Sequence, residues 1–153
     1  MKLAKILLAV LSAGLLASGC TKEYVTKEYV TNVTGLDMTL IDFKVKASNW
    51  NYRDIPKGND DEGFYEAILE VPQITKEVVD KGMVMVNRSQ EAVWTPLPSM
   101  FTEKTFVNEN PYYFTTYVDF EWQQGQVNIF VTASDLYAGE APPEMHFRVA
   151  IQL

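Results

Sequence analysis

Hydrophobic and polar residues alternate in several short segments of the chain, which is the period of a β-strand with one buried face. The segment 145–153 shows this pattern best, since every odd position is apolar and every even position except Ala150 is polar. Residues 41–46 repeat the pattern, and residues 65–71, which alternate except at Ile68, indicate a strand that Pro72 ends. The alternation predicts strands at these three places and a chain that ends inside a sheet.

Further strands are expected between residue 71 and residue 145. Residues 83–86 are all apolar and predict a buried strand. Residues 93–98 contain two prolines, which deny ladder hydrogen bonds and therefore predict an edge strand or a loop. Residues 112–122 and 127–133 predict a hairpin, because Gly125 lies in the turn between them.

One short helix is expected over Lys76–Lys81. Thr75 can serve as its N-cap, and Gly82 stands where a helix normally ends. About six or seven short strands and one helix favour a mainly β fold, either an antiparallel β-sandwich or a partly open barrel. We expect one domain over residues 36–153, which is long enough for a single core.

The first 19 residues have the composition of a secretory signal peptide. Lys2 and Lys5 precede a mostly apolar stretch, and small residues follow at 17–19, which is the three-part pattern of a segment that is removed. Cys20 comes directly afterwards in Ala-Ser-Gly-Cys, the arrangement of a lipobox. The pattern predicts cleavage before Cys20 and lipid modification of this cysteine; the alternative is an ordinary secretory signal beside an unrelated cysteine.

Cys20 is the only cysteine in the sequence, so it has no internal disulfide partner. Two or more acyl chains hold a protein stably on a bilayer, at about 0.8 kcal/mol for each buried methylene. The next residue is Thr21, not the Asp that usually retains such proteins in the inner membrane of enterobacteria. We therefore expect a protein of the cell envelope that is lipid-anchored in the outer membrane, on either its periplasmic or its outer face.

The residues after the cysteine contain one five-residue unit twice. Thr-Lys-Glu-Tyr-Val occupies 21–25 and again 26–30, and two copies are too few for a solenoid. We expect residues 20–35 to form a tether. In an extended conformation it would lift the domain by about 50 Å, while a short helix or pairing with another copy of the tether are alternatives.

Charge and composition exclude several classes of function. Removal of residues 1–19 takes away two lysines and no acid, which leaves 11 basic and 20 acidic residues and a net charge of −9. This balance argues against binding of nucleic acid. We expect no metal and no cofactor, because His146 is the only histidine, and residues 59–62 lack the spacing of a calcium loop.

Catalytic arrangements are also not favoured by the sequence. Glu66 with Glu70, or Asp119 with Glu121, could supply the carboxylate pair of a glycosidase. Both pairs stand at exposed strand positions, where acids normally keep a sheet soluble. His146 falls on the wetter face of its strand and has no nucleophile motif near it. We expect that the protein is not an enzyme.

Aromatic residues provide the best candidates for a binding surface. Trp50, Tyr52, Trp94 and Trp122 are the ligand-binding candidates, because exposed rings on a sheet can stack on sugars or anchor a protein. Trp50 and Tyr52 also follow residues 41–46 closely enough to continue that strand. Such rings are ordinary core residues of β-sandwiches as well, so a purely structural role is the alternative.

Several segments together resemble a group of small Bacteroidetes cell-envelope lipoproteins of unknown function with a C-terminal β-rich domain. They are residues 41–46 with Trp50, and residues 71–75, 82–84, 95–98 and 145–149. Several members of that group carry a collagen-like glycine repeat after the lipidated cysteine, where this chain has the two five-residue units. The resemblance implies an envelope location and a β-rich fold, and no activity.

We therefore expect a non-enzymatic binding or scaffolding domain that is held on the membrane by the lipid on Cys20 and contacts an envelope protein or a glycan. A carbohydrate-binding accessory of a glycan-uptake system is the first alternative. A hydrolase with a carboxylate pair is the second, and it requires two acids within about 10 Å of each other in a concave site.

Overall fold

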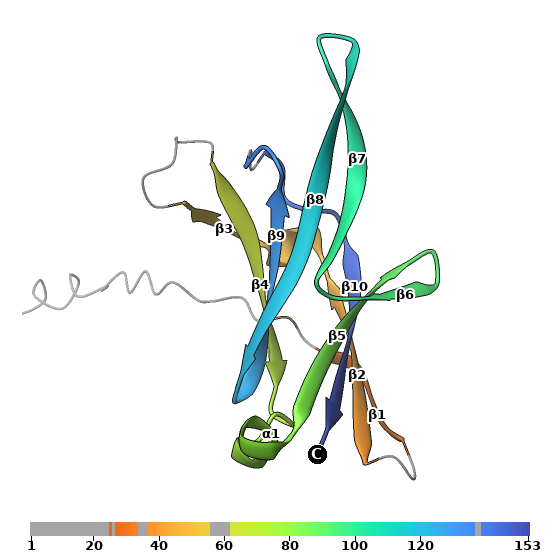
Figure 1. The fold of residues 1–153 in the computed structure, drawn as a ribbon, viewed down its shortest axis with the longest axis vertical. Helices are drawn as coiled ribbons and strands as arrows, with labels where there is room; N and C mark the ends of the chain where they lie inside the picture. The colour runs from red at the N-terminus through yellow and green to blue at the C-terminus, as the bar shows by residue number, and fades with distance from the viewer. Residues whose placement is uncertain (1–24, 26, 34–36, 56–61, 137–138) are drawn as a thin grey trace, which may run out of the picture.

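The computed structural model describes residue 25 and residues 27–33, 37–55, 62–136 and 139–153, which form two stacked antiparallel sheets (Figure 1). The first sheet has the strand order β1-β2-β10-β5-β6, and the second has the order β3-β4-β9-β8-β7. The elements are β1 (Lys27–Val33), β2 (Met38–Val45), η1 (Ala47–Asn49), β3 (Asn51–Asp54), β4 (Gly63–Val71), α1 (Lys76–Lys81), β5 (Met83–Gln90), β6 (Val93–Pro96), β7 (Ser99–Val107), β8 (Asn110–Gln123), β9 (Gly125–Ala133) and β10 (Met145–Gln152). The predicted fold class, a mainly β sandwich with one short helix, is confirmed.

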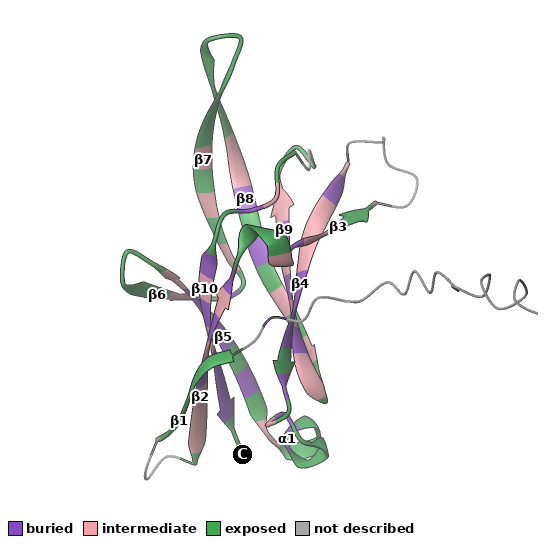
Figure 2. Cartoon of the chain, turned by 180° about the vertical axis from the view of Figure 1, so that it is seen from behind, coloured by how far each residue is buried: buried purple, intermediate pink, exposed green. Residues whose placement is uncertain are grey.

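The core lies between the two sheets and consists of the inward positions of the alternating strands. In the first sheet, Phe147 on β10 pairs with Phe43 on β2, and Val149 pairs with Val86 on β5. All four side chains are buried, as the purple bands in Figure 2 show for these strands. Each large apolar side chain buried in this way contributes about 1.5–3 kcal/mol. β10 is thus a central strand, and the prediction that the chain ends inside a sheet is confirmed.

The chain crosses from one sheet to the other at several points, and three of these connections bury an apolar side chain. Trp50 lies between β2 and β3, Ile74 between β4 and α1, and Leu97 between β6 and β7. The Trp50 ring packs edge-on against Phe147, with 6.4 Å between ring centroids. The connections therefore close the sandwich as well as linking its layers.

The helix begins and ends where the sequence predicts. Thr75 Oγ1 accepts a hydrogen bond from the Val78 N–H at 3.4 Å, and the Gly82 N–H donates to the Val78 carbonyl at 2.8 Å. A Cβ at Gly82 would lie 2.6 Å from the Gln152 carbonyl oxygen. The glycine is thus required for the close approach of β10.

Three details of the predicted strands are wrong or incomplete. Trp50 and Tyr52 do not continue β2, because η1 turns the chain and places Tyr52 in the second sheet. Residues 83–86 are not buried on both faces, since Met83 and Met85 point to solvent. The described residues form ten strands, and β7 is among those that the alternation does not reveal, because it carries Glu103 at an inward position.

The second five-residue unit belongs to the folded domain. Residues 27–33 form β1, which pairs with β2 from Lys27 to Val33, with a shift of register between Lys27 and Tyr29. Val25, the last residue of the first unit, is 2% exposed, lies in the core and donates its N–H to the Ile68 carbonyl at 3.0 Å. Val25 and residues 27–33 of the segment expected as a tether over 20–35 therefore belong to the sandwich. Cys20 and residues 21–24 lie outside the described residues.

The β7–β8 hairpin extends beyond the rest of the sandwich at the end opposite α1 (Figure 1). Asn108 and Glu109 form its turn with φ values of 50° and 67°, the left-handed conformation that a tight hairpin turn needs. The inner face of this overhang has no strand of the first sheet opposite its tip. Its inward positions are consequently free to line a surface instead of a core.

Removal of β10 should abolish folding. A chain that ends at Met145 loses a strand that pairs with both β2 and β5, together with the buried side chains of Phe147, Val149 and Ile151. We expect no cooperative thermal transition by circular dichroism for this variant. A cooperative transition like that of the full chain would show that β10 is dispensable.

Candidate functional site

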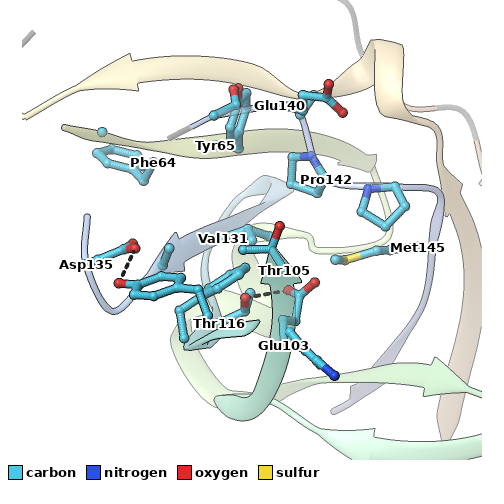
Figure 3. Close-up of a pocket in the computed structure, with 18 of the residues that line it drawn as sticks. Phe64, Tyr65, Glu103, Thr105, Thr116, Val131, Asp135, Glu140, Pro142 and Met145 are labelled. Atoms are coloured by element: carbon cyan, nitrogen blue, oxygen red, sulfur yellow. Dashed lines mark hydrogen bonds between the residues drawn. The ribbon is translucent and has the colours of Figure 1, made fainter. Parts of the chain in front are cut away.

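A hollow of about 650 Å³ lies at the end of the sandwich from which the β7–β8 hairpin extends. This volume is in the range of small-molecule sites. It is enclosed by the inner face of the second sheet and by the connection between β9 and β10 (Figure 3). Its lining residues are Gly63, Phe64, Tyr65, Glu103, Lys104, Thr105, Val107, Tyr112, Phe114, Thr116, Val131, Ala133, Asp135, Gly139, Glu140, Ala141, Pro142, Pro143 and Met145.

Glu103 and Thr116 form a polar pair on the β7–β8 wall of the hollow. The buried Thr116 hydroxyl donates to Glu103 Oε1 at 2.5 Å. Both residues stand at inward positions of their strands, next to Phe101 and Phe114. Polar side chains are tolerated there because the wall faces the hollow, and the short hydrogen bond fixes the orientation of the Glu103 carboxylate.

Two tyrosines at the rim of the hollow hydrogen-bond the second sheet to the connection between β9 and β10. The Tyr112 hydroxyl donates to Asp135 Oδ2 at 3.0 Å, and the Tyr65 hydroxyl donates to the Gly139 carbonyl at 2.6 Å. Both bonds connect a strand of the second sheet to the β9–β10 connection. The hydrogen bond to Asp135, and then its negative charge, raise the pKa of Tyr112.

Arg88 on β5 ties the first sheet to the β7 wall near the hollow. Its guanidinium carbon lies 4.0 Å from the centroid of the Phe101 ring, and its Nη2 donates to Gln90 Oε1 at 3.0 Å. Burial lowers the pKa of Arg88, and the nearby charge of Glu103 partly opposes that effect. The side chains of Arg88 and Phe101 both stand at inward positions, so the guanidinium lies between the two sheets and stacks on the inner face of β7.

The hollow combines aromatic surface with an excess of negative charge. Tyr65, Tyr112 and Phe114 supply rings from inward strand positions, and three carboxylates line the same space. The Phe64 ring is on the outer face of the second sheet, 5.9 Å from the ring of Phe130. The acids are Glu103, Asp135 and Glu140. The Lys104 ammonium group lies on the outer face of the hairpin, 4.8 Å from the centroid of the Phe106 ring and 5.8 Å from that of the Tyr113 ring. The lining of the hollow disfavours phosphates and other anions and suits a ligand that donates hydrogen bonds and has an apolar face.

The structure does not bring together the four aromatic candidates from the sequence. Trp50 is in the core, and Trp122 packs partly buried against the core from β8. Tyr52 is 37% exposed at the edge of the second sheet, where its ring lies 5.8 Å from that of Tyr65 and its hydroxyl donates to the Glu62 carbonyl at 3.1 Å. Trp94 is on the first sheet, and none of the four lines the hollow.

Trp94 instead belongs to a charged cluster on the outer face of the first sheet. The Arg148 guanidinium carbon lies 4.2 Å from a ring centroid of Trp94. Arg148 also donates from Nε and Nη2 to the two carboxylate oxygens of Asp42, at 2.6 and 2.8 Å. The Asp42 hydrogen bond raises the pKa of Arg148. The packing accounts for this ring without a ligand.

The acidic pairs considered from the sequence face away from the hollow. Glu66 accepts two hydrogen bonds from Arg53, at 2.8 and 2.7 Å, on the outer face of the second sheet, and Asp119 and Glu121 lie on the same face by their strand register. His146 on β10 lies 3.3 Å from Glu144. Among the described residues, no group of three or more His, Cys, Asp or Glu is placed to hold a metal ion.

Sequence reasoning missed the acids of the hollow because each looks ordinary in the chain. Glu103 stands between threonine and lysine in a segment without regular alternation, and Asp135 and Glu140 belong to a connection. The sequence indicates the site only through the charge of Glu103 at an inward position of β7. The register of β7 with β8 is needed to recognise that this position points inward.

Comparisons of the chain with models of protein families, with curated proteins and with solved structures find no match. Within the part of the chain that the structure describes, no helix has the length and apolar character needed to cross a bilayer.

Replacement of Asp135 by Asn should lower the pKa of Tyr112. Asp135 favours the neutral phenol, so the stabilisation by this contact is complete below the ordinary tyrosine pKa of about 10 and is lost as the pH rises through the raised pKa of Tyr112. In an alkaline titration followed by ring NMR signals, we expect Tyr112 to ionise later than a free tyrosine in the parent chain and earlier in Asp135→Asn. Asp119→Asn, on the outer face of β8, is the control, and an equal effect of both variants would contradict the assignment.

Proposed function

We propose that this protein is a non-enzymatic binding protein of the bacterial cell envelope, anchored by lipid on Cys20, and that its sandwich binds sugar units of a glycan in the hollow. The observation that carries the proposal is the joint presence of aromatic rings and oriented carboxylates in one concave site. Rings offer a stacking surface for the apolar face of a sugar, and carboxylates accept hydrogen bonds from its hydroxyls.

The charge of the site narrows the ligand to neutral or amine-bearing sugars. Glu103, Asp135 and Glu140 line the hollow, and Arg88, the cation beside Glu103, offsets only one of these three charges, so a uronic acid or a phosphorylated sugar would be repelled. Tyr65 and Tyr112 are held by their hydroxyl groups, which keeps their rings oriented before the ligand arrives. A site arranged in advance loses less entropy on binding.

Binding should depend on Tyr112 and not on Tyr117. Both tyrosines are on β8 with similar exposure, 42% and 47%, but only Tyr112 lines the hollow. On an array of neutral and amine-bearing glycans followed by calorimetry, we expect Tyr112→Ala to weaken binding by about tenfold or more and Tyr117→Ala to leave it unchanged. Glu103→Gln should also weaken it. Retention of no glycan by the parent protein, or equal losses for the two tyrosine variants, would sink the proposal.

A hydrolase is the second candidate, because Glu103, Asp135 and Glu140 line one concave site. This placement meets the general requirement for a carboxylate pair better than the pairs considered from the sequence. The same glycans that bind should therefore be incubated with the protein and analysed for new reducing ends. Release of such ends by the parent chain and not by Glu103→Gln would establish hydrolysis, whereas binding without release supports the binding protein.

The anchor rests on the lipobox at Ala-Ser-Gly-Cys and on the resemblance to envelope lipoproteins. Replacement of Cys20 by Ser should release the protein from the membrane fraction without unfolding it, because Cys20 precedes the first core residue, Val25, by five positions. Cell fractionation with circular dichroism of the released protein provides the measurement. A Cys20→Ser variant that stays in the membrane fraction would refute the anchor.

A further inference from the structure

Val25 fixes how far the folded domain can be from the lipid anchor. Its side chain is 2% exposed within the core, and its backbone N–H is bound to the Ile68 carbonyl beside β4. Only residues 21–24 separate it from Cys20. Five residue steps span at most about 18 Å even when fully extended, so the bilayer must lie much closer to the domain than the 50 Å that a tether over 20–35 would allow.

Val25 also identifies the side of the sandwich that faces this short connection. Val25 forms a β-bridge with Leu69 on β4. This bridge is on the same edge of β4 that pairs with β3 at residues 63–66. After Val25 the chain continues to β1 in the other sheet. β1 and β3 are the edge strands of the two sheets on that side, and the crossing from β2 to β3 lies between them. We call residues 27–33 and 46–54 the anchor edge.

The anchor edge combines exposed aromatic side chains with a small positive charge. More exposed apolar side chains lie on β7 and β8, but these strands are at the opposite side of the second sheet from β3 and from the short connection to Cys20. Tyr29 is 68% exposed, and Val30 and Tyr52 are also exposed. Tyrosine side chains favour the boundary between lipid headgroups and acyl chains. The edge carries three basic and two acidic residues, whereas the chain after residue 19 has a net charge of −9. An anionic bilayer would therefore not repel this edge, although it would repel the chain as a whole.

We propose that the anchor edge docks on the surface of the bilayer that holds Cys20, so that the sandwich lies on its side and its strands run along the membrane. The inference rests on the lipid anchor of the proposed function. It adds an interaction surface, the bilayer as its partner, and an orientation in which the hollow opens parallel to the membrane.

The orientation can be tested with two labels at matched positions. Tyr29 on β1 and Val93 on β6 have similar exposure, 68% and 64%, but stand on opposite edges of the same sheet, about 19 Å apart at the usual strand spacing. Acylated Cys20 cannot react with a thiol reagent, so Tyr29→Cys or Val93→Cys provides a single labelling site in the lipidated protein.

Each labelled, lipidated variant is reconstituted into vesicles of phosphatidylethanolamine and phosphatidylglycerol that contain a headgroup-linked quencher. We expect quenching of the label on β1 to exceed that on β6 severalfold, and equal emission without vesicles. Equal quenching, or stronger quenching on β6, would overturn the orientation while the anchor stands. Failure of both variants to associate with vesicles would overturn the anchor, and the inference with it.

A second measurement tests the length limit itself. Val25 and Val30 occupy the same place in the two five-residue units, yet one is in the core and the other is 45% exposed. We expect Val25→Ala to lower the melting temperature by about 5 °C or more and Val30→Ala to change it little. If Val25→Ala is no more harmful than Val30→Ala, Val25 does not hold the chain at the core and the limit of about 18 Å fails.

Discussion

The burial of one apolar face of each sheet against the other is the interaction on which the rest of this structure depends. Phe147 is at its centre, because it lies on the strand that pairs with both β2 and β5 and contacts the ring of Trp50, which closes the first crossing between the sheets. The strand order places β10, the last strand in the chain, between β2 and β5, which lie much earlier in the sequence. The first sheet is therefore completed only when the end of the chain is in position, and contacts between distant residues dominate the fold.

The hollow is a consequence of unequal sheet lengths. β8 has 14 residues, whereas β2, β5 and β10 have eight each, so the hairpin of β7 and β8 continues past the end of the opposing layer. Inward positions that would otherwise be core become the wall of a site, which explains how Glu103 and Thr116 can stand in line with buried valines such as Val118. The hydrogen bonds of Tyr65 and Tyr112 to the β9–β10 connection then hold the remaining side of the hollow.

The sequence was informative wherever a local rule and the tertiary structure agree. The alternation at 145–153, the cap at Thr75 and the turn glycine at Gly125 predicted β10, α1 and the β8–β9 hairpin, because each depends on neighbours in the chain. Trp50 was misjudged because its burial depends on a crossing between the sheets, and β7 was missed because its inward Glu103 faces a hollow. No pattern within β7 reports which surface will lie opposite it, so the site could not be located without the register of the strands.

Val25 and Val30, the last residues of the two identical five-residue units, have different structural environments, and this bears on how many copies the chain can have. With one unit, the sequence Cys-Thr-Lys-Glu-Tyr-Val would still supply β1, but the residue in the place of Val25 would be the cysteine itself. If Cys20 carries the proposed lipid, the core position between β1 and β4 and the attachment point of that lipid would then compete for one residue. Two copies are thus the smallest number that separates these tasks, and each further copy would lengthen the connection by up to about 18 Å without altering the sandwich. Under the proposed anchoring, the number of repeats sets how far the domain can lie from the membrane, while its fold stays constant.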